Sequence, residues 1–253
     1  MSQALVITAA GMSTRFSKSL GKEVSKVLYS EGTPLDCLLG FQLSLGLEAG
    51  FEIIVVVVGY KAESVIDFVS RWFPSDRIRI VRNSLFSSHG TCESLACAIR
   101  SVQSMSLDSL VYIEGDLYFD EPTLAGIAQS NYNVITANTE IIRADTSVIF
   151  SIDEHDCLHY AYDVNHRSLS LDTSFKVLGN SGQAWKFASF NKLVEVVEEL
   201  NARELEGTNL IPITRYFNSI DVSTIRFAVF KEWVNCNTVA DYRLILKRLR
   251  KEA

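Results

Sequence analysis

A run of small residues follows the first apolar segment of the chain and ends in a basic residue. Residues 9–16 read Ala-Ala-Gly-Met-Ser-Thr-Arg-Phe, directly after the apolar segment Ala4–Thr8. Small side chains let backbone N–H groups approach phosphate oxygens closely, and Arg15 offers a fixed fork of donors suited to a polyphosphate. Three lysines follow at spacings of four residues: Lys18, Lys22 and Lys26. The segment indicates a phosphate-binding loop, with a solvated basic patch as the alternative.

The loop matches neither of two common nucleotide-binding motifs. It has neither the G-x-G-x-x-G spacing of dinucleotide-binding proteins nor the G-x-x-x-x-G-K-[ST] spacing of a P-loop. No G-x-S-x-G is present, which argues against a serine hydrolase. The four histidines form no HxH pair, and a histidine metal site is not expected. The five cysteines form no CxxC pair, and we expect reduced thiols in a cytoplasmic protein.

The first half of the chain alternates short apolar runs with helical stretches. The expected strands are Ala4–Thr8, Ile53–Val58, Ile78–Val81 and Leu110–Ile113. The expected helices are Pro34–Ala49, Ala62–Phe73 and Cys92–Ser104. Continuous apolar strands are typical of a parallel sheet buried on both faces, and the alternation predicts βαβ units in a doubly wound α/β fold. The small-residue loop then lies at the carboxyl end of the first strand, where such proteins bind ligands.

After about residue 130 the strands become shorter and the turns more polar. The expected strands are Val134–Ala137, Ser147–Ile152, His159–Asp163, Phe175–Leu178 and Arg226–Val229. The expected helices are Phe190–Glu204 and Val239–Lys251. No low-complexity linker or repeat interrupts the chain. We therefore expect one domain over residues 1–253, with a nucleotide-binding half at about 1–130 and a substrate-binding half at about 131–253.

Composition excludes several classes of protein. The 24 basic and 30 acidic residues give a net charge of −6, which argues against nucleic acid as the main ligand. A hydrophobic fraction of 47% and a charged fraction of 21% are ordinary for a globular protein. The longest apolar run, Ile53–Val58, is too short to cross a bilayer. The N-terminus lacks the basic region of a signal peptide, so no membrane partner is expected.

Motifs in four places resemble one family when they are taken in order. The loop with Arg15 and Phe16, then Lys26-Val-Leu, then Pro34-Leu35, resembles the signature of the nucleotidyltransferases that make activated sugars and alcohols. Ser25 stands where that signature usually has Pro, and Lys22 is the alternative to Lys26. The other three places are Val81-Arg82-Asn83 with Gly90-Thr91 and Glu93-Ser94-Leu95, then Glu114-Gly115-Asp116, and then Asn235 to Tyr242.

Within this superfamily the chain is most similar to the CTP:phosphocholine cytidylyltransferase type. The shared features are Arg15-Phe16, Asn83 about a dozen residues before Ser94-Leu95, and the late Val-x-Asp-Tyr at Val239. The resemblance implies a three-layer, Rossmann-like, mixed and mainly parallel sheet of the nucleotide-diphospho-sugar transferase type. It also implies a Mg²⁺-dependent enzyme of EC 2.7.7 type. Such an enzyme moves CMP from CTP onto a small phosphorylated or phosphonate alcohol such as phosphocholine and releases pyrophosphate.

The same resemblance implies roles for individual residues. Lys26 would contact the α-phosphate and Arg15 the β- and γ-phosphates, because catalysis here is positioning and neutralisation of charge. Asp116 and Asn237 would supply oxygen ligands to Mg²⁺. The alternative for Asn237 is a helix N-cap, which Thr238 could also provide, and the alternative for Asp116 is a turn residue. The implied nucleotide-binding residues are Ala9, Ala10, Gly11, Met12, Ser13, Thr14, Asn83, Gly90, Thr91 and Ser94.

The acceptor site is predicted from the aromatic residues of the second half. A trimethylammonium group favours an aromatic cage, and we predict that Trp185, after a turn at Gly179–Gly182, forms its wall together with Tyr162. The other candidates are Tyr132, Tyr160, Tyr216, Asp163 and Asp172. The alternative for these aromatics is the hydrophobic core. A neutral polyol or sugar phosphate would instead need polar groups such as Asn180, Ser181 and Asn209.

Two other functions stay open at this point. One is a related transferase that uses another NTP with a sugar-1-phosphate or other acceptor. The other is a non-catalytic nucleotide-binding module, which Ser25 and Asn237 would permit. The expected partners are an NTP and a small phosphorylated acceptor, and a homodimer is also left open.

Overall fold

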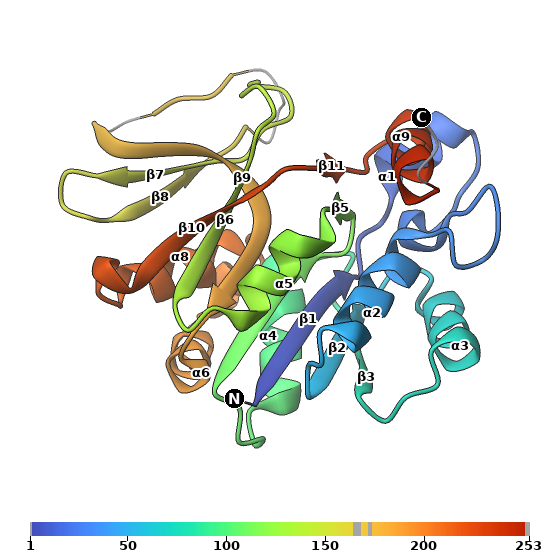
Figure 1. Ribbon diagram of the computed structural model, residues 1–253, viewed down its shortest axis with the longest axis horizontal. Helices are drawn as coiled ribbons and strands as arrows, with labels where there is room; N and C mark the ends of the chain where they lie inside the picture. Colours follow the sequence, from blue (N-terminus) through green and yellow to red (C-terminus); the bar gives the residue numbers. More distant parts are fainter. Residues whose placement is uncertain (1, 164–167, 172–173, 251–253) are drawn as a thin grey trace.

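Four parallel strands form the part of the sheet that the apolar runs predict. The computed structural model describes residues 2–163, 168–171 and 174–250. The four strands lie side by side in Figure 1. They are β1 (Gln3–Ala9), β2 (Ile53–Val58), β3 (Ile78–Arg82) and β4 (Ser109–Glu114). β1 pairs with β2 and β4, and β2 pairs with β3, all in parallel. Every residue of β2 is buried, as a continuous apolar run requires.

The second half of the chain extends the same sheet through one long strand. β9 (Phe175–Phe187) pairs antiparallel with β4 on one side and with β6 (Asn133–Asn138) on the other. The remaining strands are β7 (Ile149–Asp153), β8 (Leu158–Ala161) and β10 (Ile225–Phe230). The main path of the sheet runs β10-β6-β9-β4-β1-β2-β3. This mixed sheet confirms the predicted α/β fold class.

Helices cover both faces of the sheet and make three layers (Figure 1). α2 (Leu38–Glu48), α3 (Ala62–Trp72) and α5 (Glu121–Gln129) pack on the face to which Leu5 and Ile7 point. α4 (Thr91–Val102), α6 (Phe190–Glu198) and α8 (Leu210–Asn218) pack on the face of Ala4 and Val6. Successive side chains of a strand point to opposite faces. The buried strands therefore contribute side chains to two separate hydrophobic cores, one on each face of the sheet.

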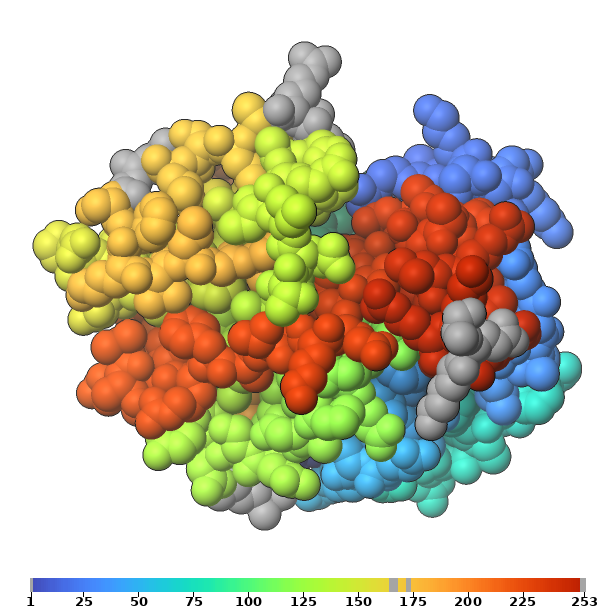
Figure 2. Space-filling model, turned by 45° about the horizontal axis from the view of Figure 1, so that its top comes forward, coloured from blue at the N-terminus to red at the C-terminus, as the bar shows by residue number. Residues whose placement is uncertain are grey.

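A third core joins the two ends of the chain beside the sheet. α1 (Thr14–Leu20) and α9 (Val239–Leu249) share a cluster that contains Phe16 and Tyr242. Figure 2 shows the red C-terminal residues against the blue N-terminal segment, and an ion pair of 2.9 Å joins Arg243 to Glu31 there. The short strands β5 (Leu117–Phe119) and β11 (Trp233–Asn235) pair antiparallel and bring the start of α9 to the end of β4.

The structure corrects several local predictions. The helix expected over residues 190–204 is two helices, α6 and α7 (Ala202–Leu205), because a capping box of Asn201 and Glu204 starts a new helix. The turn predicted at Gly179–Gly182 is wrong, since these residues lie inside β9. The sequence patterns also missed α1 and α8, as well as the 3₁₀ turns Lys26–Leu28 and Val222–Thr224.

Two sequence-based expectations concern the surroundings of the protein. Within the ranges that the structure describes, none of the helices combines the length and apolarity needed to span a bilayer. All five cysteines carry free thiols, and Cys37, Cys92 and Cys236 are buried. Burial raises the pKa of the Cys37 thiol to about 11, which keeps it protonated and unreactive near neutral pH.

Candidate functional site

A cavity of about 340 Å³ opens at the carboxyl ends of β1 and β4. The small-residue loop predicted to bind phosphate forms one of its walls. The cavity also collects most of the other predicted site residues, which come from four separate stretches of sequence. Its lining includes Ala9, Ala10, Gly11, Met12, Ser13, Thr14, Arg15, Lys26, Gly90, Thr91, Ser94, Asp116 and Asn237.

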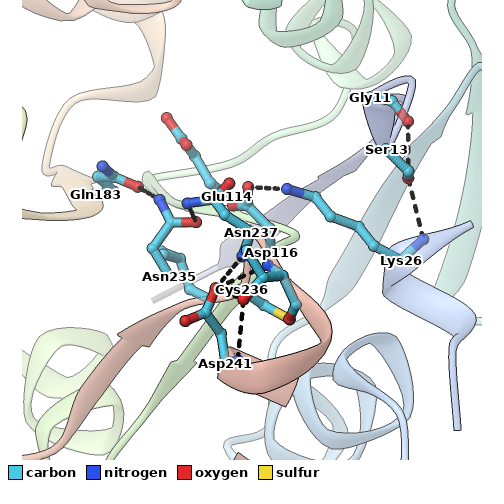
Figure 3. A network of polar contacts seen from close by, with 12 residues as sticks. Gly11, Ser13, Lys26, Glu114, Asp116, Gln183, Asn235, Cys236, Asn237 and Asp241 are labelled. Carbon is cyan, nitrogen blue, oxygen red and sulfur yellow. Dashed lines mark hydrogen bonds and ion pairs between the residues drawn. The ribbon is translucent and has the colours of Figure 1, made fainter. Parts of the chain in front are cut away.

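Ser13 fixes the shape of the loop and ties it to Lys26. Its backbone adopts the left-handed conformation with φ of 56°. Its hydroxyl accepts a hydrogen bond of 3.0 Å from the backbone N–H of Lys26 (Figure 3). The stretch between is the helix α1, which Gly21 closes with φ of 73°. Lys22 lies exposed beyond that turn and does not line the cavity, whereas Lys26 does, so the structure favours Lys26 over Lys22.

Lys26 and Asp116 form the central ion pair of the cavity. The Lys26 ammonium lies 2.6 Å from Oδ2 of Asp116, and the two side chains are only 14% and 19% exposed. Figure 3 shows this contact, with Asn237 next to the carboxylate. The pair places a cation and an anion at the bottom of a cavity whose other charged lining residues are Arg15, Glu114 and the titratable His89.

Two buried oxygens in this cluster lack any hydrogen-bond donor among the described residues. They are Oδ1 of Asp116 and Oδ1 of Asn237. The Asn237 amide nitrogen donates to Oδ1 of Asn235 at 3.0 Å, which is consistent with this orientation of the side-chain oxygen. Thr238 caps α9 in a capping box with Asp241, so Asn237 is not needed as the N-cap. Unpartnered buried oxygens are costly unless a ligand satisfies them.

These two oxygens suit a hard divalent cation. Carboxylate and amide oxygens are ligands that Mg²⁺ accepts, and Mg²⁺ usually takes one or two from protein and the rest from phosphates and water. Within the described ranges, no group of three or more His, Cys, Asp or Glu residues could hold a metal by itself. The donor set therefore fits an ion that is shared with a phosphate ligand better than a closed structural site.

Glu114 is a residue of the cavity to which the sequence analysis assigned no role. Its Oε1 accepts a hydrogen bond of 2.8 Å from the side-chain amide of Asn209, at the start of α8. Burial, followed by the negative charge of Asp116, raises the pKa of the Glu114 carboxyl to about 7. Its position two residues before Asp116 was a signal in the sequence. Its partner could not be foreseen, because α8 was not expected.

The start of α4 is held by a segment from the second half of the chain. The N–H of Gly90 donates to the carbonyl of Glu206 at 3.0 Å, and that of Cys92 donates to the carbonyl of Gly207 at 3.2 Å. A Cβ on Gly90 would lie 2.0 Å from the Gly207 oxygen, so only glycine fits this close approach. Two more residues of the loop before α4 line the cavity, and neither was predicted: Phe86 and His89.

Asn83 differs from the other predicted nucleotide-binding residues. Its side chain is buried and is not part of the cavity lining. Its amide nitrogen donates to the Ser94 hydroxyl at 3.0 Å, and its oxygen accepts from the N–H of Leu85 at 2.9 Å. Both the nitrogen and the oxygen of the Asn83 side chain are therefore hydrogen-bonded within the protein, and Asn83 holds Ser94, which lines the cavity. A direct contact between Asn83 and a base stays a prediction that this placement does not favour.

The predicted role of Trp185 is wrong. Its side chain is fully buried in β9. One face stacks on Tyr112 with ring centres 5.4 Å apart, and the indole N–H donates to the Tyr160 hydroxyl at 2.7 Å. An indole packed in the core offers no face to a cation. Strand pairing explains the burial, because Trp185 lies opposite Tyr112 of β4 and Ile135 of β6 at the centre of the sheet.

Most of the other residues predicted for the acceptor site are also buried or in contact with other side chains of the protein. Tyr216 is buried and donates to Asn133, and Tyr132 lies under the Arg226 guanidinium at 3.9 Å. Asn180 and Ser181 are buried in β9. Tyr162 is 38% exposed and lies outside the cavity lining, so its role stays a prediction. Asp172 lies outside the described residues.

Comparison with known proteins identifies the family of this chain. A family model described as "Domain of unknown function (DUF6564)" matches residues 22–249. The chain belongs to this family. The match begins after the Ala9–Phe16 loop and includes Lys26, Asp116 and Asn237. The DUF6564 chain is also 27% identical over 137 residues to the bifunctional protein GlmU of Paracoccus denitrificans (strain Pd 1222), covering 54% of this chain but only 28% of that protein.

Solved structures show where the DUF6564 fold belongs. The CTP:phosphocholine cytidylyltransferase of Streptococcus pneumoniae (LicC) superimposes with a TM-score of 0.68 at 15% identity, covering 98% of this chain and all of that one. A putative glucose-1-phosphate thymidylyltransferase from Bacillus anthracis superimposes with a TM-score of 0.72 at 13% identity, covering 100% of this chain and 96% of that one. These likenesses confirm that the DUF6564 chain has the fold of the nucleotidyltransferase superfamily.

Proposed function

We propose that this chain is a metal-dependent nucleotidyltransferase that moves a nucleoside monophosphate, CMP from CTP, onto a small phosphorylated or phosphonate alcohol. The observation that carries the proposal is the meeting of Arg15, Lys26, Asp116 and Asn237 in one cavity below the small-residue loop. Arg15 and Lys26 belong to the first motif of the sequence, whereas Asp116 and Asn237 come from two later motifs. Two of these residues hold buried oxygens that have no hydrogen-bond donor among the described residues. The likeness of fold agrees with the proposal.

In the proposed reaction an acceptor phosphate attacks the α-phosphorus of the NTP in line, and pyrophosphate leaves. No covalent bond to the protein is needed, so the chain contributes position and charge. Lys26 would neutralise the charge that develops on the α-phosphoryl group. Arg15 and the backbone of the Gly11–Thr14 loop would hold the departing pyrophosphate.

Asp116 and Asn237 would hold the Mg²⁺ ion. When bound, the ion would neutralise phosphate charge and orient the reacting groups. Asn237 contributes no charge, so Asp116 carries the only formal negative charge of the pair. Asp116 must exchange its contact with Lys26 for the ion, or share its carboxylate between them through Oδ1, which is still unpartnered.

The choice of CTP and of a cationic acceptor such as phosphocholine rests on the sequence motifs and on the fold shared with the CTP:phosphocholine cytidylyltransferase of Streptococcus pneumoniae. The burial of Trp185 removes the predicted indole wall, and of the two aromatics predicted to form that wall only Tyr162 is exposed. A sugar phosphate is the second candidate, because a putative glucose-1-phosphate thymidylyltransferase shares the fold over the whole chain. A cytoplasmic location and a homodimer are predictions from the sequence.

A pyrophosphate-release assay tests the proposal. CTP, UTP, GTP and ATP are each incubated with Mg²⁺ and with phosphocholine, phosphoethanolamine, 2-aminoethylphosphonate or glucose-1-phosphate. We expect release with CTP and one of the three cationic acceptors. Release with another NTP and glucose-1-phosphate would favour the second candidate. Nucleotide binding without release from any pair would overturn the enzymatic proposal and leave a nucleotide-binding module.

A further inference from the structure

Glu114 adds a second acidic side chain to the cavity, beside Asp116. Oε1 is held by the Asn209 amide at 2.8 Å, and no donor among the described residues contacts Oε2. Like charges repel strongly in such a poorly solvated place. In its charged form, an acidic group beside a phosphate site is therefore best placed facing a cation or a hydrogen-bond donor of the ligand.

Asn209 holds Glu114 in a network of four hydrogen bonds. The Thr91 hydroxyl donates to Oδ1 of Asn209 at 2.9 Å and accepts from the Asn209 backbone N–H at 2.9 Å. The amide nitrogen then faces Glu114 and the Tyr112 hydroxyl, each at 2.8 Å. Oε1 of Glu114 thus accepts from Asn209, and Oε2 is the atom left for a ligand.

The direction of the strand decides which part of a nucleotide this oxygen meets. Glu114 points to the same face of β4 as Tyr112, toward Thr91 and the start of α4. Asp116 follows two residues later and meets Lys26, at the end of the cavity where the phosphates would bind (Figure 3). The ribose is the part of a nucleoside triphosphate that adjoins the α-phosphate. Its vicinal hydroxyls are donors of the kind that carboxylates bind in other nucleotide sites.

We infer that Glu114 is a specificity-determining residue that accepts a hydrogen bond from the ribose 2′-hydroxyl of the NTP, and that Asn209 is its positioning residue. The inference rests on the proposed function and deepens it. The site then selects ribonucleotides over 2′-deoxyribonucleotides. A hydrogen bond to a charged acceptor corresponds to a preference of about tenfold to a hundredfold.

The test compares the four ribonucleoside triphosphates with their 2′-deoxy counterparts. The value of kcat/KM is measured for each pair by pyrophosphate release with the acceptor that the wild-type protein uses. We expect wild-type protein to prefer the ribonucleotide of its chosen base by about tenfold or more. Glu114→Ala should reduce that ratio to within about threefold, chiefly by slowing the ribonucleotide. Asn209→Ala should reduce it less, because the carboxylate remains but loses its orientation.

Controls separate this role from folding and from metal binding. Glu63→Gln removes an exposed carboxylate that pairs with Arg82 outside the cavity, and it should leave the ratio unchanged. Glu114→Gln keeps the shape of the side chain and serves if the alanine variant unfolds. Equal use of both sugars by the wild-type protein would overturn the inference, and so would an equal loss for both sugars in Glu114→Ala. Weaker binding of Mn²⁺ alone to Glu114→Gln would reassign Glu114 as a metal ligand.

Failure of the proposed function has a different signature. In that case none of the eight nucleotides releases pyrophosphate. The dissociation constants of CTP and 2′-deoxy-CTP, measured by calorimetry on the wild-type protein, then decide the inference. Equal constants, or no binding of either nucleotide, would overturn it.

Discussion

At the scale of single residues, the chemistry of the cavity depends on what Asp116 contacts. Its Oδ2 lies 2.6 Å from the Lys26 ammonium, and its Oδ1 is buried without a donor among the described residues. Asn237 supplies the other unpartnered oxygen. One carboxylate therefore links the cation of the chain to the ion that the proposed reaction needs.

Replacement of Asp116 by Asn tests this arrangement. We expect a loss of at least about a hundredfold in kcat, because the metal ligand loses its charge next to the reacting phosphates. Binding of Mn²⁺, followed by electron paramagnetic resonance, should weaken in parallel, while the circular dichroism spectrum stays that of the wild-type protein. Normal turnover by the variant would remove Asp116 from the site.

The two lysines after the loop provide a matched pair. Lys26→Ala should lower kcat strongly with a modest change in KM for the NTP, because a contact on the α-phosphate strengthens in the transition state. Lys22 is exposed and outside the cavity, so Lys22→Ala should be mild. Steady-state kinetics of both variants decide the matter, and the reverse order of effects would place Lys22 on the phosphate.

The buried position of Trp185 leads to a prediction about the stability of the protein. Its buried ring stacks on Tyr112 and bonds to Tyr160, so Trp185→Ala should lower the free energy of unfolding by about 3 to 5 kcal/mol. Urea denaturation measures this change. Where the folded variant can be assayed, KM for the acceptor should stay close to the wild-type value. A selective rise in that KM without loss of stability would restore the cation-binding role.

At the scale of elements, the start of α4 depends on the segment between α7 and α8. Gly90 approaches the Gly207 carbonyl so closely that a Cβ would lie 2.0 Å from its oxygen. The same segment leads into Asn209, which holds Thr91 and Glu114. The wall of the cavity near α4 is therefore built jointly by two elements from opposite halves of the chain.

Gly90→Ala should disturb the contact between the start of α4 and residues 206–207. The new methyl group must push residues 206–207 away, at a cost of about 1 to 3 kcal/mol in the free energy of unfolding. KM for the NTP should rise as well, because Thr91 and Asn209 move with them. The control is Gly126→Ala in α5, where a Cβ meets nothing within 4 Å, and this variant should be neutral or slightly stabilising. Equal melting temperatures for the two variants would contradict the prediction.

At the scale of the whole molecule, a single sheet carries both halves of the chain. β9 lies between β4 and β6 and places Lys186 in a buried position. The ammonium of Lys186 donates to the carbonyl of Ala128 in α5 at 2.7 Å. Burial lowers the pKa of Lys186 from 10.5 to about 8. The free energy of unfolding therefore depends on pH through the protonation of Lys186.

The sign of that coupling follows from proton binding. Between about pH 8 and pH 10.5 the unfolded chain keeps the Lys186 proton that the folded chain releases, so the contribution of Lys186 to stability rises with pH. The ammonium borders a second cavity, and with allowance for screening there we expect a rise of about 1 to 2 kcal/mol. Urea denaturation of wild-type protein and Lys186→Met at pH 7.5 and pH 10 should show that difference. A gap between them that does not change with pH would disprove it.

The sequence by itself determined the parallel strands, the position of the small-residue loop and the residues of the cluster around Lys26 and Asp116. A strand buried on both faces is typically a continuous apolar run, so β1, β2 and β4 could be identified from the apolar runs in the sequence. The carboxyl ends of parallel strands meet at one edge, so motifs far apart along the chain could be assigned to one site.

Only the tertiary structure decided which side chains face the cavity and which lie behind it. Trp185 and Asn83 carry groups that suit a ligand, yet strand pairing buries the first and a turn engages the second. The contacts of Gly90 with Gly207 and of Glu114 with Asn209 join segments about a hundred residues apart. The physical reason is that local patterns determine the face of a strand or helix that is apolar, whereas long-range packing determines what covers that face.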